Sequence, residues 1–336
     1  MYLLKIDLES LLPVFISVGV VILLALLFLG YVYLSTKMFK KAFLRPKPLP
    51  AVDRSPLNID QSTINGKGRN WFYANRIEFM NVRVEAFDKV KLAGYYRPSF
   101  DKTTKNVVIL LHGRDEHPSE MGSYAKLLMK VFQCHVLIAH QRAHGMSEGK
   151  YCTYGLFESV DLLSWIDFVK RQVGPDCRIY ILGRCMGSTA ALLAAQQNDM
   201  PSNVAGIIAD CPYDSAENAL YHYGKRKFGV LIAPIMLWLR LCAKKTIGMD
   251  MSLCDCAPRA GRIKVPVLIF QGTEDIIAIP EFSRRIYDNI RSPKRMITIP
   301  GARHLMCYDT ATELYEKEVT KFIEQCVILL AKQGRL

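Results

Sequence analysis

The chain is short of acidic residues. Its 336 residues include 31 Asp and Glu against 44 Lys and Arg, which gives a formal net charge of +13. A basic balance of this size favours contact with nucleic acid or with an anionic membrane surface. The sequence has no nucleic-acid-binding motif and no basic stripe with interleaved aromatic residues. We therefore expect no nucleic-acid partner and favour a membrane surface.

The ten cysteines lack the spacing of a disulfide framework or a zinc site. They are scattered along the chain, several within predicted strands and helices, which is typical of reduced, buried thiols in a cytosolic domain. Cys254 and Cys256 form a C-x-C pair, but no second pair stands at zinc spacing. The sequence thus predicts no metal site and no cofactor.

Charged residues are also missing from Leu11 to Leu34. As a helix this stretch would span about 36 Å, enough to cross a hydrocarbon core of about 30 Å. Signal peptides have shorter apolar regions, so we favour an uncleaved single-pass anchor in the cell membrane over a signal peptide or a buried core helix. The positive-inside rule places the rest of the chain in the cytoplasm, because basic residues follow the run: Lys37, Lys40, Lys41, Arg45 and Lys47.

The chain divides into a tail and anchor (1–36), a linker (37–76) and one large domain (77–336). The linker is basic and rich in proline, with little periodicity. The domain alternates apolar runs with helical patterns, which predicts an α/β fold: a mostly parallel sheet flanked by helices. The alternation breaks at about 213–260, where we expect a helical cap, with an ordinary core helix as the alternative. The expected strands are 77–86, 89–96, 106–111, 134–139, 178–182, 204–210, 265–270 and 295–299.

The central motif of the domain is Gly183-Arg184-Cys185-Met186-Gly187. It stands between the strand predicted at 178–182 and a helical pattern from Ser188 onward. A strand, a G-x-nucleophile-x-G turn and a helix form a nucleophile elbow. The central residue, here Cys185, is strained and stands at the helix N-terminus, where negative charge is favoured. A buried structural cysteine is the alternative explanation of an isolated motif.

Two further candidates follow later strands. Asp275, with Glu274 as its competitor, follows the strand at 265–270, and His304 follows the last strand. Ligands bind outside the carboxyl ends of the strands in such sheets, so these residues can converge with Cys185 at one rim. His304 would take the proton of Cys185 and return it to a leaving group, while Asp275 would fix the tautomer of His304.

Two backbone N–H groups are candidates for an oxyanion hole, those of Met186 and Arg114. Met186 follows the candidate nucleophile, and Arg114 follows the strand at 106–111. We expect His112 to brace the loop of Arg114, and His144 to hold its own loop in place.

These motifs resemble those of membrane-anchored bacterial α/β-hydrolases of the serine aminopeptidase-like or esterase-like kind. The resemblance covers about residues 77–328. It rests on His112-Gly113, Arg142-x-His144-Gly145-x-Ser147-x-Gly149, Gly183-x-Cys185-x-Gly187, Ala209-Asp210-Cys211-x-Tyr213, Gly272-x-x-Asp275 and Gly301-x-x-His304. It implies an α/β-hydrolase fold and a catalytic triad, with Cys185 where the family has Ser.

The cysteine at the elbow admits three explanations. It is a native nucleophile, as in dienelactone hydrolase-like enzymes, an introduced replacement of Ser, or the mark of a weakened relative. We favour a working Cys-His-Asp triad that hydrolyses an ester or thioester bond of a small or lipid-like acyl substrate. The alternatives are an aminopeptidase-like or amidase-like hydrolase, for which no acidic amine-binding residue can be assigned, and a membrane-attached binding protein.

Overall fold

The computed structural model describes residues 8–45 and 62–335, and within these ranges the strands form one eight-stranded sheet. The strand order is β1-β2-β4-β3-β5-β6-β7-β8. All neighbours from β4 to β8 pair in parallel, whereas β1 and β2 are antiparallel. The bounds are β1 Met80–Glu85, β2 Lys91–Arg97, β3 Asn106–Leu111, β4 His135–Ala139, β5 Arg178–Arg184, β6 Val204–Asp210, β7 Val267–Gly272 and β8 Lys294–Ile299. The expected fold class is confirmed.

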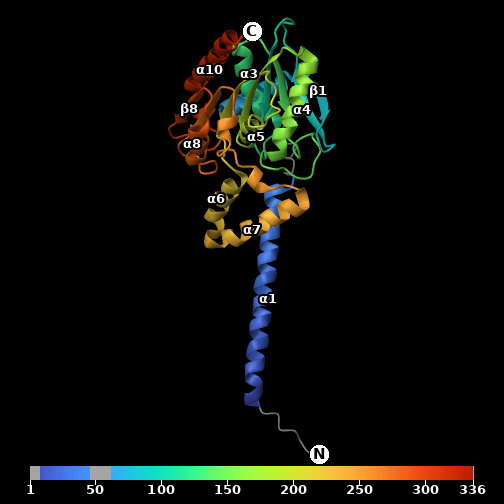
Figure 1. The fold of residues 1–336 in the computed structure, drawn as a ribbon, viewed down its shortest axis with the longest axis vertical. Coiled ribbons are helices and arrows are strands. Elements are labelled where there is room, and N and C mark those ends of the chain that lie inside the picture. Colours follow the sequence, from blue (N-terminus) through green and yellow to red (C-terminus); the bar gives the residue numbers. More distant parts are fainter. Residues whose placement is uncertain (1–7, 46–61, 336) are drawn as a thin grey trace, which may run out of the picture.

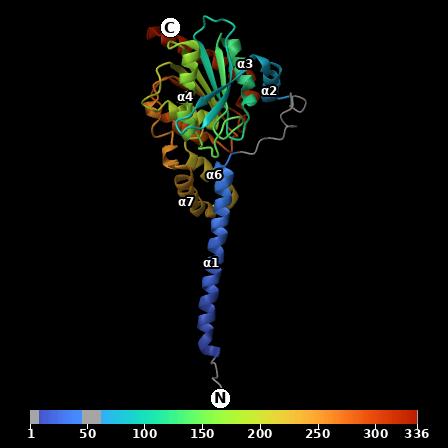
Figure 2. The same ribbon diagram turned by 90° about the vertical axis from the view of Figure 1, so that its right-hand side faces the viewer.

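Helices cover both faces of this sheet (Figures 1 and 2). α4 and α5 pack together on one face, and α2 and α3 pack together on the other. The strands β4 and β6 are buried on both faces along their whole length, as apolar parallel strands require. The helices of the sandwich are α2 Ile64–Ala74, α3 Gly122–Val131, α4 Leu156–Val173, α5 Met186–Ala194, α8 Pro280–Asn289, α9 Cys307–Thr310 and α10 Thr312–Lys332.

The first helix, α1 (Leu8–Phe43), projects away from the domain (Figure 1). Its apolar part is long enough to cross a membrane, as an anchor or as a signal sequence. The helix continues beyond the predicted span, and its last turns are buried in the domain. The buried residues include Ser35, Phe39 and Phe43. One end of α1 is therefore part of the domain core.

The segment expected as a linker, 37–76, contains helical residues. Residues 46–61 lie outside the described residues, but α1 extends into the expected linker and residues 64–74 form α2. The carboxylate of Asp309 accepts hydrogen bonds from the first backbone N–H groups of α2. A Cβ on Gly68 would lie 2.2 Å from the backbone nitrogen of Ser123. The glycines of α2, which are typical of a loop in the sequence, thus permit close packing of α2 on α3.

The segment 213–260 is helical and lies outside the sheet layers, beside α1 (Figures 1 and 2). It contains α6 (Ala216–Phe228), α7 (Ile232–Cys242) and short turns of other helix types. The helix α7 packs on α1. The Tyr31 hydroxyl donates to the carbonyl of Pro234 at 2.8 Å, and the rings of Tyr31 and Trp238 meet edge-on with centroids 6.0 Å apart.

Candidate active site

The turn between β5 and α5 has Cys185 at its centre. Cys185 has φ 47° and ψ −110°, a conformation that residues other than glycine rarely adopt. The turn needs glycine on both sides. A Cβ on Gly183 would lie 2.4 Å from the backbone of Gly187, and one on Gly187 would lie 2.2 Å from the carbonyl oxygen of Leu111. The thiol therefore stands at the N-terminus of α5, at the carboxyl edge of the sheet.

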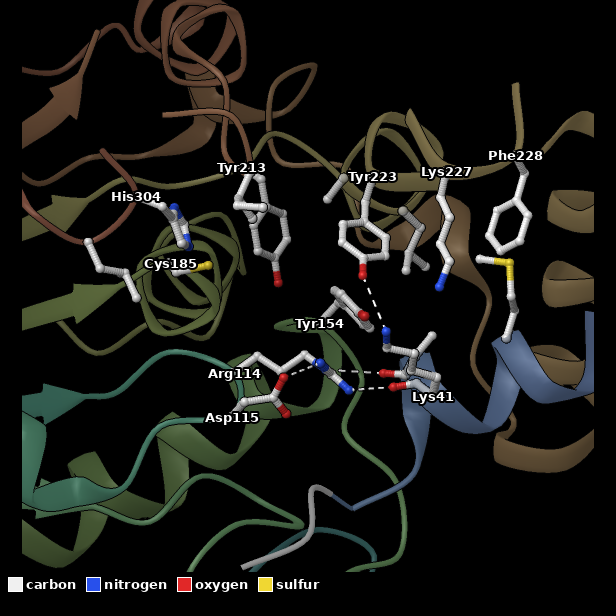
Figure 3. Close-up of a pocket in the computed structure, with 16 residues that line it drawn as sticks. Lys41, Arg114, Asp115, Tyr154, Cys185, Tyr213, Tyr223, Lys227, Phe228 and His304 are labelled. Carbon is white, nitrogen blue, oxygen red and sulfur yellow. Dashed lines mark hydrogen bonds and ion pairs between the residues drawn. The ribbon is translucent and has the colours of Figure 1, made fainter. Parts of the chain in front are cut away.

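His304 and Asp275 meet at the same edge. Nδ1 of His304 lies 2.7 Å from Oδ2 of Asp275, whose other oxygen accepts two backbone N–H groups of the following loop at 2.9 Å each. Asp275 is buried, whereas its competitor Glu274 is exposed. The ring of His304 lies beside the sulfur of Cys185 (Figure 3). The structure thus brings the three predicted side chains together in one row.

The ionisation of His304 depends on this row. Burial acts to lower the pKa of His304, but the negative charge of a Cys185 thiolate and the hydrogen bonds with Asp275 and Cys185 raise that pKa to about 10. The row therefore favours the protonated ring when Cys185 is ionised. Since Asp275 accepts Nδ1–H, the other nitrogen, Nε2, is left to face the sulfur.

The two predicted oxyanion donors flank the thiol. Met186 is the first residue of α5, and the first N–H groups of a helix have no acceptor within it. Arg114 follows β3 and lines the same cavity as Cys185. Both residues therefore belong to the part of the chain around Cys185, and their role as oxyanion donors stays a prediction.

A buried ion pair that the sequence analysis missed holds the loop of Arg114 against the elbow. One oxygen of Glu116 accepts the backbone N–H of Gly113 at 2.6 Å, and the other lies 3.0 Å from the guanidinium of Arg184. Arg184 is 2% exposed. Its position inside an otherwise apolar elbow was the signal that could have indicated a buried partner.

The side chain of Arg114 binds α1. Its guanidinium donates to the carbonyl oxygens of Ala42 at 3.1 Å and Lys41 at 2.7 Å, and it pairs with Asp115. These carbonyls belong to the last turn of α1, where the helix dipole favours positive charge. Sequence reasoning assigned only the backbone of Arg114.

A cavity of about 340 Å³ extends from the thiol toward α6 and α1. In Figure 3, Cys185 and His304 lie at one end, and Lys227 and Phe228 lie at the other. This volume suits a small molecule or part of a lipid. The wall includes tyrosines to which sequence analysis gave no role: Tyr154, Tyr213 and Tyr223.

The hydroxyl of one of these tyrosines lacks a partner in the way that a ligand-binding group does. The hydroxyl of Tyr213 is buried and has no hydrogen-bond partner within residues 8–45 and 62–335. Figure 3 shows it directed into the cavity beside Cys185. An unpaired buried hydroxyl is unfavourable unless a ligand pairs with it.

The other two histidines singled out earlier have backbone partners. Nε2 of His112 accepts the N–H of Gln141 at 3.1 Å, and Nε2 of His144 accepts the N–H of Asp115 at 3.3 Å. Burial lowers the pKa of both rings. Both are therefore neutral, and their contacts agree with the expected bracing of these loops.

Within the described part of the chain, one group of side chains has the spacing of metal ligands: Asp210, Cys211 and Cys307, all buried. The Asp210 carboxylate already accepts the hydroxyls of Tyr124 and Tyr315 at 3.1 Å each, and the thiol of Cys211 at 3.2 Å. Protein donors thus satisfy this carboxylate, and the group fits a hydrogen-bond network better than a metal site.

Known proteins share both sequence and fold with this chain. A family model described as alpha/beta hydrolase fold matches residues 106–230, and one described as serine aminopeptidase, S33, matches residues 249–311. The uncharacterized protein YqkD of Bacillus subtilis is 26% identical over 233 residues, which are 69% of this chain and 75% of that protein. Monoglyceride lipase of Rattus norvegicus is 29% identical over 121 residues, 35% of this chain and 38% of that protein.

Solved structures show the same architecture. An esterase from Pyrococcus furiosus superimposes with a TM-score of 0.58 at 22% identity, covering 76% of this chain and 95% of that one. The structure of Est1E from Butyrivibrio proteoclasticus with bound ferulic acid gives a TM-score of 0.57 at 21% identity, covering 74% and 99%. At this identity the likeness establishes the fold.

Proposed function

The chain belongs to the α/β-hydrolase superfamily, and on that basis we propose that it is a membrane-tethered hydrolase that cleaves an ester or thioester bond of an apolar acyl substrate. The observation that carries the proposal is the row of Cys185, His304 and Asp275 at the end of a mostly apolar cavity. The esterases and the monoglyceride lipase among the similar proteins support the same chemistry.

The reaction follows from the positions of these groups. The Cys185 thiolate attacks the acyl carbonyl carbon, and the carbonyl electron pair moves to the oxygen, which the N–H groups of Met186 and Arg114 stabilise. When the tetrahedral intermediate collapses, the bond to the leaving group breaks and His304 gives it a proton. Water, deprotonated by His304, then hydrolyses the acyl-thioester and releases the acid. Asp275 keeps the imidazolium oriented in both steps.

We also propose that α1 is an uncleaved anchor and that the domain, including the cap at 213–260, lies on its cytoplasmic side. The buried end of α1 supports this proposal, because Met38 and Ala42 line the cavity. Removal of the helix as a signal sequence would remove part of the cavity wall. The basic residues after the apolar run favour the cytoplasmic orientation.

The charge of the cavity favours esters over peptides with a free amine. Lys41, Arg114 and Lys227 line it, and its carboxylate, Asp115, is already paired with Arg114 at 2.5 Å. An ammonium group would meet mainly positive charge. The match to the serine aminopeptidase family model nevertheless makes amide hydrolysis the second candidate. Matched ester and amide substrates separate the two, and turnover of the amide alone would favour the second.

The test uses the full chain in detergent with short and medium acyl esters. Cys185→Ala should lower kcat/KM by more than about a thousandfold and abolish the acyl-enzyme adduct seen by mass spectrometry. Cys256→Ala, a buried cysteine that does not line the cavity, is the control. Undiminished hydrolysis by Cys185→Ala would refute the proposed nucleophile. A ligand bound without turnover or adduct would favour a binding protein instead.

A further inference from the structure

The position of α7 along α1 fixes how deep the cap lies. A hydrocarbon core of about 30 Å takes about 20 helical residues, so a helix that enters it at Leu11 leaves it near residue 31. Tyr31 contacts both Pro234 and Trp238 of α7. Aromatic residues gather at the membrane interface. If α1 crosses a bilayer, the Tyr31–Trp238 pair and α7 itself therefore lie at that interface.

The side of α7 that faces away from the protein carries exposed apolar side chains and one exposed cation, Arg240, which pairs with Glu217 at 2.6 Å. Leu237 and Leu241, one helical turn apart, are 56% and 57% exposed, and Val230 and Leu231 just before α7 are 90% and 58% exposed. Apolar side chains that are this exposed are unfavourable in water. A group of them on one segment marks a surface that something else covers.

Basic residues stand at the ends of the helices next to this segment. α6 ends in Lys225, Arg226 and Lys227, the turn after α7 carries Lys244 and Lys245, and α1 ends with Lys40 and Lys41. Cations near an anionic membrane surface strengthen binding to it. The apolar face with a basic border matches a bilayer interface in both hydrophobicity and charge.

Two of these helices, α1 and α6, line the cavity. Lys41 of α1, together with Tyr223 and Phe228 of α6, lines the end away from the nucleophile, and the Lys41 amine donates to the Tyr223 hydroxyl at 3.3 Å (Figure 3). A Cβ on Gly224 of α6 would lie 2.1 Å from Ile232 of α7, so these helices are in close contact. The cavity thus runs from the thiol to the helices that face the membrane.

We propose that α7 lies in the interface of the bilayer that α1 crosses, and that the substrate is an ester lipid resident in that bilayer, which enters the cavity between α1 and α6. The proposal rests on the proposed function for the bond that is cleaved. It adds the source of the substrate and the occupant of the exposed face of α7. A second copy of the chain on this face is the competing outcome.

The first test locates α7 without any assumption about activity. The full chain is reconstituted in liposomes whose lipids carry bromine on the acyl chain close to the headgroup, which quenches nearby tryptophans. Trp238 is half-buried beside the exposed leucines. We expect a quenched part of the fluorescence that disappears in Trp238→Phe. Equal quenching in both proteins, or a dimer cross-linked through α7, would overturn the proposal.

The second test separates entry from chemistry. The double variant Leu237→Glu/Leu241→Glu should hydrolyse an ester lipid in liposomes at least about tenfold more slowly than the wild type, yet cleave a water-soluble short-chain ester at the same rate. Ile328→Glu is the matched control, because Ile328 is 54% exposed on α10 at the far end of the domain and should change neither rate.

The outcomes distinguish this proposal from the proposed function. Equal rates on the ester lipid, or equal losses on both substrates in a folded double variant, would overturn entry from the bilayer. Failure of the wild type on every ester would refute the proposed function, and the quenching result would still decide where α7 lies. If the double variant does not fold, Leu237→Gln takes its place in the same comparison.

Discussion

Tyr213→Phe should make the protein more stable and less active. The hydroxyl that it removes is buried and has no partner within the described residues. An unpaired buried hydroxyl costs about 1–3 kcal/mol, so the free energy of unfolding should rise by up to that amount. In a domain of this size the rise corresponds to roughly 2–4 °C in Tm per kcal/mol. A hydrogen bond from the hydroxyl to a substrate oxygen contributes about 0.5–1.5 kcal/mol, so kcat/KM should fall about two- to thirteenfold.

Two other tyrosines provide controls. The hydroxyl of Tyr180 is also buried without a partner in the described ranges, but Tyr180 lies in the first half of β5, away from the cavity, so Tyr180→Phe should stabilise without loss of activity. The hydroxyl of Tyr124 donates to Asp210, so Tyr124→Phe should destabilise. Urea unfolding followed by circular dichroism gives the stabilities, and hydrolysis of a soluble ester gives the rates. A destabilised Tyr213→Phe protein with unchanged kinetics would refute the reasoning.

Two further predictions concern pH. Asp275→Asn removes one cause of the raised pKa of His304, which is about 10 in the intact site. The alkaline limb of the kcat/KM profile, where the imidazolium loses its proton, should therefore move to lower pH, and the rate should fall by about 10²–10⁴. An unmoved limb would contradict this assignment. Burial lowers the pKa of His140 to about 3. In the unfolded chain the His140 ring binds a proton near pH 6.5, whereas in the native protein it binds one only near pH 3. The free energy of unfolding should therefore fall by about 1.4 kcal/mol per pH unit as the pH falls from about 6.5 to about 3. Urea titrations should show a shallower loss for His140→Asn, and parallel curves would count against a neutral buried ring.

The sheet was predictable because the burial of each strand is visible in the residues of that strand alone. The strands β3, β4 and β6 are almost wholly buried, so nearly every position in them is apolar. The helix α2 was not predictable in the same way. Its first N–H groups bind Asp309, which stands 245 positions further along the chain, and its glycines serve contacts with α3. Tertiary contacts of this kind leave no local pattern in the sequence.

The sequence predicted that three candidate side chains would meet at one edge of the sheet, but it did not predict the walls of the cavity. Cys185, Asp275 and His304 each follow a strand, so the topology of a parallel sheet brings them to one edge. The tyrosines of the cavity, by contrast, come from loops and from α6, and nothing in their spacing indicates a common space. The unpaired hydroxyl of Tyr213 becomes visible only when every neighbour has been placed.

The contacts at the end of α1 were likewise not predictable from the local sequence, and they change the role expected of the anchor. From the sequence we expect the helix to be a tether, joined to the domain through a linker over residues 37–76. In the structure Arg114 spans the carbonyls of Lys41 and Ala42 with its guanidinium, while its backbone N–H is the proposed oxyanion donor. If α1 crosses a bilayer as proposed, a change in its tilt would move Arg114, which lines the same cavity as Cys185. We therefore expect the proposed membrane insertion and the geometry of the proposed site to be coupled through this arginine.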